Sequence, residues 1–176
     1  MKIYKTEYKS PLGKITICCD EQENIVGVWF SGQKHFGDTI NIKTIKKDNL
    51  KIFNITKKWL DKYFKGKKPN IKDIPLKLTG TEFRQQVWKI LCKIPYGKTI
   101  TYGDIAKQIA KQNGITKMSA QAIGGAVGHN PIAIIIPCHR VVGKNGSLTG
   151  YAAGTDKKKK LLELEQSNMV KYAIRK

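Results

Sequence analysis

Residues 130–142 read Asn-Pro-Ile-Ala-Ile-Ile-Ile-Pro-Cys-His-Arg-Val-Val. The β-branched run at 132–136 predicts a buried extended segment, and a thiol, an imidazole and a guanidinium follow it at Cys138, His139 and Arg140. Positive charge beside a cysteine lowers its pKa from about 8.5 and favours the nucleophilic thiolate. The stretch therefore predicts a thiolate site at the end of a buried segment. A buried apolar cysteine beside a surface histidine would give the same short pattern, so the pattern alone leaves both readings open.

Two short helices are predicted upstream of this stretch. Thr101 and Asp104 form a variant of the capping box, and apolar residues follow at helical spacing up to Ala110. Ser119 begins a second helix that runs to about residue 128 and is rich in alanine and glycine. With the glycine-containing turn between them, the two helices make a helix-turn-helix pattern. The small residues would allow close approach either to a DNA groove or to another helix, and both remain open.

The N-terminal part predicts a separate folding region. Short runs of β-forming residues lie at 3–8, 15–19 and 25–30, and a helical pattern follows at 50–64. Residues 65–78 carry two prolines and no clear period, which is typical of a linker. We therefore predict an N-terminal domain over 1–78, including the linker at 65–78, and a C-terminal domain over 79–176.

The charge of the chain restricts its partners. The 176 residues carry a formal net charge of +20, and 30 of the 33 basic residues are lysine. Such a charge attracts polyanions, of which nucleic acid is the commonest, although biased codon usage would also enrich lysine. No apolar run reaches the ~18–20 residues that a membrane span requires, and the N-terminus lacks the apolar core of a signal peptide. We expect a cytoplasmic protein without a membrane partner.

The cysteines give no metal-binding pattern. They stand at 18, 19, 92 and 138, with no C-x-x-C pair, and the histidines at 35, 129 and 139 lack ligand spacing. We therefore predict no metal site. Three of the four cysteines are expected to be small apolar residues, and Cys138 differs from them because of its neighbours.

The longer string from Asn130 to Val142 resembles the active-site signature of the O6-alkylguanine-DNA alkyltransferases, the methylated-DNA–protein-cysteine methyltransferases. The resemblance covers most of residues 80–166, and further matching strings lie at 83–88, 100–106, 122–126, 150–151 and 161–165. It implies an α/β N-terminal domain with a small antiparallel sheet, followed by a mostly helical C-terminal domain that contains a helix-turn-helix. The N-terminal part itself shows only a loose similarity in pattern.

The resemblance also implies an activity. Cys138 would accept an alkyl group from O6 of guanine, and also from O4 of thymine, in double-stranded DNA, in a single turnover without cofactor. His139 would act as general base through a water molecule, with Glu165 orienting the imidazole. Asn130 would brace the junction before the active-site segment, and the hydroxyl of Tyr102 would meet N3 of the guanine. The protein is expected to act as a monomer.

Further substrate or DNA contacts are carried over from the family to Ala120, Gln121, Gly124, Arg140, Val141, Tyr151 and Ala152. Gln121 departs from the family, which usually has an arginine that enters the duplex and holds the space of the flipped base. Glutamine lacks the charge and the stacking plane of arginine, which puts the efficiency of base flipping in doubt. Lys158, within a run of four lysines, matches a family lysine near the pocket, although such a run is also typical of a solvated helix start. The basic tail 167–176 is expected to be a flexible terminus.

Three rival functions remain open on the sequence. A basic helix-turn-helix regulator would explain the charge but not the Pro-Cys-His-Arg string. A non-enzymatic binder of alkylated DNA would lack the acceptor cysteine, which is present here. A cysteine hydrolase would share the Cys138, His139 and Glu165 trio but would turn over, whereas a suicide alkyltransferase consumes itself.

Overall fold

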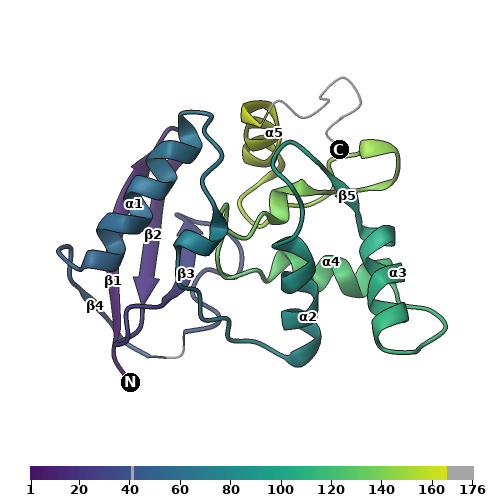
Figure 1. Cartoon of the computed structure of the whole chain (residues 1–176), viewed down its shortest axis with the longest axis horizontal. Helices are drawn as coiled ribbons and strands as arrows, with labels where there is room; N and C mark the ends of the chain where they lie inside the picture. The colour runs from purple at the N-terminus through teal and green to yellow at the C-terminus, as the bar shows by residue number, and fades with distance from the viewer. Residues whose placement is uncertain (41, 166–176) are drawn as a thin grey trace. The chain divides into compact units, whose positions relative to one another are not determined.

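The structure is a computed structural model that describes residues 1–40 and 42–165 and consists of two compact units (Figure 1). The first unit holds Met1–Thr79 together with Pro131–Ile135, and the second holds Gly80–Asn130 and the chain from Ile136 onward. The tail 167–176, expected to be flexible, lies outside the described residues. In the part of the chain described, no helix has the length and apolar character that a membrane span needs.

The first unit is built on a four-stranded sheet. Its strands are β1 (Ile3–Ser10), β2 (Gly13–Cys19), β3 (Ile25–Phe30) and β4 (Thr44–Lys46), in the spatial order β3-β2-β1-β4. The expected antiparallel sheet is confirmed in β1, β2 and β3. The sequence reading missed β4, which pairs in parallel with β1 and makes the sheet mixed.

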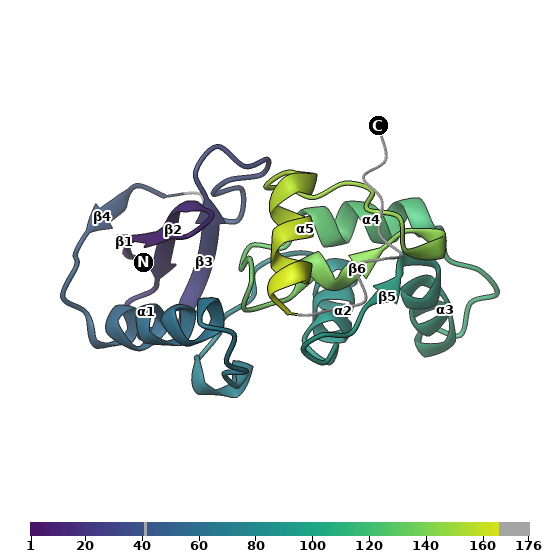
Figure 2. The same cartoon turned by 90° about the horizontal axis from the view of Figure 1, so that it is seen from above.

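Both faces of this sheet are covered. Helix α1 (Lys51–Phe64) lies across one face, as both views show (Figures 1 and 2). Its buried residues are Ile52, Phe53, Thr56, Trp59, Leu60 and Tyr63. On the other face, Cys18 and Trp29 belong to a smaller apolar cluster, and Phe36 lies against the Trp29 ring at a centroid distance of 5.4 Å. Gly27 makes room for that ring, because a Cβ there would lie 2.0 Å from it.

Two short segments complete the outer edge of β3. Ile25 exchanges backbone hydrogen bonds with Pro75 and Lys77, of 2.8 and 3.0 Å. Further along, the Val28 N–H donates to the Pro131 carbonyl at 2.9 Å, and the Ala133 N–H donates to Val28 at 2.9 Å. An edge strand with unpaired backbone groups invites pairing with other chains, and these segments prevent it.

The predicted extended segment at 132–136 is buried but is not a strand. Only Ile132 forms a bridge to β3. After it the chain makes a tight three-residue turn, in which the Ile135 N–H donates to the Ala133 carbonyl at 2.8 Å and Ile134 has a φ of 69°. A β-branched residue rarely adopts this left-handed conformation, so the surrounding structure must impose it. The β-branched run identified the burial correctly and the backbone conformation wrongly.

The second unit is mostly helical, as expected. Its helices are α2 (Glu82–Leu91), α3 (Tyr102–Gln112), α4 (Ala120–Gly128) and α5 (Thr155–Leu164). The predicted cap at Thr101 and the predicted helix start at Ser119 are confirmed. The hydroxyls of Thr101 and Ser119, and also that of Thr81, each accept from a backbone N–H in the first turn of α3, α4 and α2. Thr101 and Asp104 also form the full reciprocal capping box. The helix-turn-helix is therefore formed by α3 and α4.

A two-stranded parallel ribbon, which the sequence did not predict, connects the helix-turn-helix to the segment that follows Cys138. It pairs β5 (Ile100–Thr101) with β6 (Val141–Val142). Because β5 leads directly into α3 and β6 follows the 3₁₀ turn Cys138–Arg140, the ribbon fixes the start of α3 beside that turn.

Candidate active site

Cys138 begins a single 3₁₀ turn at a point where the chain is held tightly. The Cys138 N–H donates to the Ile136 carbonyl at 2.8 Å, across Pro137. The side chain of Asn130 donates to the same Ile136 carbonyl at 2.9 Å. Cys138, His139 and Asn130 are each less than 7% exposed. The expected role of Asn130 as a brace therefore corresponds to a direct contact with the residue two positions before the thiol.

The thiol of Cys138 lies among polar groups inside the protein. The side chains of Asn130 and Tyr151 lower its pKa as hydrogen-bonding groups, and the ammonium of Lys158 lowers it by charge. Burial opposes all three and is the larger effect, so the pKa of Cys138 is raised above its ordinary value. The expectation of a thiol pKa below the ordinary value is therefore wrong. That expectation counted nearby positive charge and left out the burial of the thiol, which outweighs it.

Arg140 is directed at a different group. Its Nε donates to Oε2 of Glu165 and its second amino group donates to Oε1, both at 2.9 Å. The remaining amino group donates to the Ile94 carbonyl at 2.7 Å, and the guanidinium lies over the Tyr96 ring. The resemblance had implied a substrate or DNA contact for Arg140. In the structure all three of its nitrogens hydrogen-bond within the second unit, and it is the ion-pair partner of Glu165.

His139 and Glu165 form a buried pair. Nε2 of His139 lies 2.7 Å from Oε1 of Glu165, and both side chains are fully buried. The Gly97 N–H donates to Oε2 at 3.3 Å, so the carboxylate receives hydrogen bonds from His139, Arg140 and the 94–97 turn. These partners hold the pKa of Glu165 far below its usual range despite burial. Because Nε2 then carries the proton shared with an anion, Nδ1 is the imidazole nitrogen that can accept one.

The pKa of His139 is lowered. Burial is the main cause, and the charges of Arg140 and Lys158 act in the same direction, while Glu165 raises it. The imidazole is therefore neutral at neutral pH and can act as a base. The Cys138 thiol therefore keeps its proton at neutral pH until a base removes it, and the neutral imidazole of His139 can be that base.

Tyr102, at the start of α3, lies on another side of the same site. Its hydroxyl donates to the Thr149 carbonyl at 3.0 Å and receives a long contact of 3.5 Å from Nζ of Lys158. Burial is the main cause that raises the pKa of Tyr102, to about 12, and the negative charge of Cys138 in its ionised form acts in the same direction. Gly124 of α4 faces this ring, since a Cβ there would lie 4.0 Å from it. Tyr102 therefore lies beside α4 and near Cys138.

Lys158 lies inside the protein near Cys138 and Tyr102, in agreement with its match to a family lysine near the pocket. It is 0% exposed, and Nζ donates to the Gly150 carbonyl at 3.1 Å. Burial lowers its pKa to about 8. A signal was present in the sequence: Leu161 and Leu162 follow at helical spacing, so Lys158 occupies the apolar face of α5, and the alternative of a solvated helix start is wrong for this lysine.

The remaining predicted contacts lie in two places. Val141 is fully buried in β6, and Tyr151 and Ala152 lie half-buried in the turn before α5. The Tyr151 hydroxyl is buried and acts on Cys138 as a hydrogen-bonding group that lowers the pKa of the thiol.

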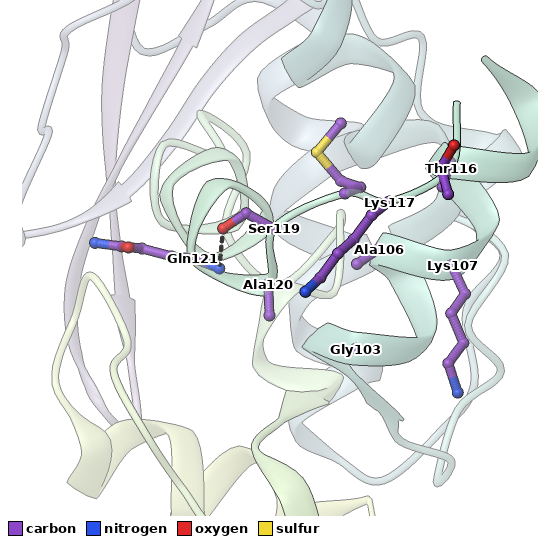
Figure 3. A pocket seen from close by; sticks show the side chains of 10 residues that line it. Gly103, Ala106, Lys107, Thr116, Lys117, Ser119, Ala120 and Gln121 are labelled. Atoms are coloured by element: carbon purple, nitrogen blue, oxygen red, sulfur yellow. Dashed lines mark hydrogen bonds between the residues drawn. The ribbon is translucent and has the colours of Figure 1, made fainter. Parts of the chain in front are cut away.

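Ala120 and Gln121 lie at the exposed start of α4 and line a hollow of about 600 Å³ between α3 and α4 (Figure 3). Lys107 and Lys117 lie along the rim of this hollow, and the Gln121 side chain extends away from it (Figure 3). Helix N-termini with nearby lysines favour phosphate groups. The helix-turn-helix therefore presents cations where a DNA backbone could pass.

Comparison with known proteins accounts for both units. Residues 82–167 match the family described as 6-O-methylguanine DNA methyltransferase, DNA binding domain, and residues 3–78 match its ribonuclease-like domain. The chain is 40% identical to a methylated-DNA–protein-cysteine methyltransferase of Haemophilus influenzae, over 93% of this chain and 87% of the relative. It is 41% identical to one of Methanosarcina barkeri, over 95% and 99%. A crystal structure of Mycobacterium tuberculosis OGT in complex with DNA has a TM-score of 0.78 at 37% identity, over 94% of this chain and 93% of that one.

Proposed function

The chain belongs to the 6-O-methylguanine DNA methyltransferase family, and we propose that Cys138 is the residue that takes the alkyl group from DNA. The protein repairs alkylated DNA directly, as a methylated-DNA–protein-cysteine methyltransferase. The assignment of Cys138 rests on the buried pair of His139 and Glu165, because His139 directly follows Cys138 in the chain. Cys18, Cys19 and Cys92 have no such pair beside them among the described residues.

The transfer is a single displacement. Sγ of Cys138 forms a bond to the alkyl carbon while the bond between that carbon and O6 of the guanine breaks. His139 takes the thiol proton through Nδ1, by way of a water molecule, and Glu165 supports the resulting imidazolium through Nε2. The raised pKa of Cys138 makes this base necessary, and the lowered pKa of His139 makes it competent at neutral pH.

The leaving guanine gains negative charge, and Tyr102 is placed to offset it. In the structure its hydroxyl donates to the Thr149 carbonyl. We assign the same hydrogen to N3 of the flipped guanine, with the backbone carbonyls of Cys138 and Val141 accepting from the exocyclic amine. The backbone N–H of Ala152 would reach O6. The product is a thioether, which water does not cleave, so each molecule acts once.

O6-alkylguanine in double-stranded DNA is the proposed substrate, with O4-alkylthymine as a second one. Ala120, Gln121 and Gly124 of α4 are assigned to the DNA, and Tyr151 to the wall of the base pocket. All proposed catalytic groups lie within residues 79–176 of one chain, which supports a functional division at 78/79 and a monomeric protein. A thiol acceptor must stay reduced, which favours the cytoplasm as its compartment.

The assignment is tested by mass measurement. The full chain is incubated with a duplex containing O6-methylguanine, digested, and its cysteine peptides are weighed. We expect a gain of about 14 Da, the mass of CH₂, on the Cys138 peptide only, at one methyl group per protein. The variant Cys138→Ser should give no adduct, and Cys92→Ser should behave as the unaltered protein. An adduct on another cysteine, or more than one methyl removed per protein, would overturn the proposal.

A further inference from the structure

The N-terminal unit carries a large charge that the transfer reaction does not use. Residues 1–79 hold 17 lysines against eight acidic residues, and they hold no arginine. Lysine suits contact with phosphates, because it is a mobile and well-hydrated point charge, whereas arginine suits base edges and two-pronged ion pairs. The composition of this unit therefore favours a polyanion bound without sequence readout.

The lysines of α1 are arranged as a ridge. We call four exposed lysines the α1 ridge. They are Lys51, Lys58 and Lys62 of the helix and Lys65, its C-cap residue, and they recur at spacings of seven, four and three residues. At 100° per residue they fall within about 60° of one another on the helix. The buried residues of α1 lie on the opposite side of the helix. The helix itself runs along the sheet (Figure 2). The α1 ridge therefore points away from the sheet.

The positive charge of the α1 ridge is not neutralised within its own unit. Among residues 1–40 and 42–165, none of its four lysines forms an ion pair. The one acidic residue of α1, Asp61, instead accepts a hydrogen bond of 2.7 Å from the Tyr8 hydroxyl on β1. Other lysines of the unit do have carboxylate partners, such as Lys14 with Glu7 and Lys77 with Asp20.

One lysine of the ridge, Lys51, has an unfavourable interaction with the helix dipole. Lys51 is the first residue of α1, where the positive end of the dipole disfavours a cation, and the first turn holds no acidic residue. A carboxylate from outside the helix, Glu23, accepts from the Ile52 N–H at 3.1 Å and partly compensates. A local rule that is broken at an exposed position is expected where the residue serves an interaction.

We propose that the α1 ridge is a second DNA-binding surface, which holds backbone phosphates without reading sequence. From Lys51 to Lys65 the helix rises about 21 Å, at 1.5 Å per residue. Duplex DNA carries one phosphate charge per 1.7 Å of axis, so the ridge runs along roughly six base pairs. The α1 ridge shares no residue with the thiol site or the helix-turn-helix, and the proposal does not depend on Cys138 being the acceptor.

The test compares two variants of the full chain with the same net charge. The ridge variant carries Lys51→Gln, Lys58→Gln, Lys62→Gln and Lys65→Gln. The control carries Lys2→Gln, Lys9→Gln, Lys34→Gln and Lys43→Gln, at exposed positions outside α1. Glutamine and lysine have similar helix propensities, so α1 should persist, which circular dichroism checks.

Binding to an undamaged 30-base-pair duplex is measured by fluorescence anisotropy at several salt concentrations. Each phosphate contact contributes about 0.9 to the slope of log K against log salt. If two of the four lysines contact phosphates at a time, the slope falls by about 2 in the ridge variant and affinity at 0.15 M salt falls roughly 30-fold. The control should change the slope by less than one.

Two outcomes would overturn the proposal. Equal losses in both variants would mean that only the net charge of the protein matters. A ridge variant that binds DNA normally but loses binding to vesicles of anionic lipid would assign the ridge to a membrane surface.

Methyl transfer from a short single-stranded oligonucleotide to each variant is measured alongside, and we expect its rate to be unchanged. Loss of transfer in both variants and in the unaltered protein would be a failure of the proposed function and not of the ridge.

Discussion

Replacing Arg140 by glutamine should disable the base by leaving its carboxylate partner without a counter-ion. The guanidinium gives Glu165 two hydrogen bonds of 2.9 Å, and it ties the Ile94 carbonyl to the same point at 2.7 Å. The Glu165 side chain is fully buried, so water cannot replace the lost partner. His139 and the Gly97 N–H would remain as its hydrogen-bond donors.

The expected loss of stability follows from that burial. Removing one partner of a buried ion pair costs about 3–5 kcal/mol, and one retained glutamine hydrogen bond places the expected loss near 3 kcal/mol. For a chain of this length that lowers Tm by roughly 6–12 °C. The loss should be complete above about pH 5 and should shrink as the pH falls, because the depressed pKa of Glu165 gives stability only while the carboxylate is ionised.

The kinetic effect has a defined pH dependence. Arg140 and Lys158 lower the pKa of His139, and Glu165 raises it. Without Arg140 the effect of Glu165 is less opposed, so the pKa of His139 rises and the imidazole is protonated in more of the molecules. A rise of one unit reduces the neutral form about tenfold at pH values below the pKa. Transfer should therefore fall most at low pH and recover as the pH rises.

Single-turnover transfer from methylated duplex, measured between pH 5.5 and 9, tests this directly. Arg140→Lys keeps the charge without the two-pronged geometry and should lie between Arg140→Gln and the unaltered protein. Arg84→Gln removes a half-buried arginine that forms no ion pair among the described residues and serves as the matched control. An Arg140→Gln protein with an unchanged Tm and an unchanged pH profile would refute the reasoning.

Three further predictions concern other parts of the molecule. Lys158→Met should raise the free energy of unfolding at pH 7 by up to about 3 kcal/mol, because burial lowers the pKa of Lys158 to about 8, and it should slow transfer. The unaltered protein should gain stability between about pH 8 and 10.5, and the variant should not; a variant that keeps this gain in pH-dependent denaturation would contradict the assignment. Gln121→Arg should speed repair in duplex DNA, where a side chain must fill the place of the flipped base, and it should leave the rate of repair in single-stranded DNA nearly unchanged. Equal changes of the rate on both substrates in stopped-flow assays would count against a limiting role for Gln121. Gly27→Ala should lower the free energy of unfolding, measured by urea denaturation, by about 2 kcal/mol, because the added Cβ would lie 2.0 Å from the Trp29 ring. An unchanged urea midpoint would show that the ring moves aside freely.

Local features were predictable from the sequence because they depend on neighbouring residues. The caps at Thr101 and Ser119 involve only residues three positions away or nearer, and the structure has both. The strand runs of the N-terminal part were also recognised, because β-forming residues cluster within each one. β4 has only three residues, too few for a pattern, and it was missed.

The site depended on contacts that the sequence does not encode locally. Arg140 lies 25 residues from Glu165, and nothing near either residue indicates the pair. The burial of Cys138 also outweighs the positive charge near it, so the predicted direction of its pKa was wrong. The resemblance to a known family supplied Glu165 and Tyr102, which composition and spacing alone would have left among ordinary core residues.

The short segment Pro131–Ile135 limits how this protein can be divided. Because it belongs to the first unit although it lies within the sequence of the second, no single cleavage of the chain separates two complete folding units. A fragment ending at Thr79 would leave the backbone groups of Val28 bare at an edge strand. A fragment starting at Gly80 would carry an apolar segment without its strand, which is a hazard for aggregation. The two fragments should therefore be poorly soluble alone and regain activity when mixed, in the manner of a split enzyme reassembling from its halves.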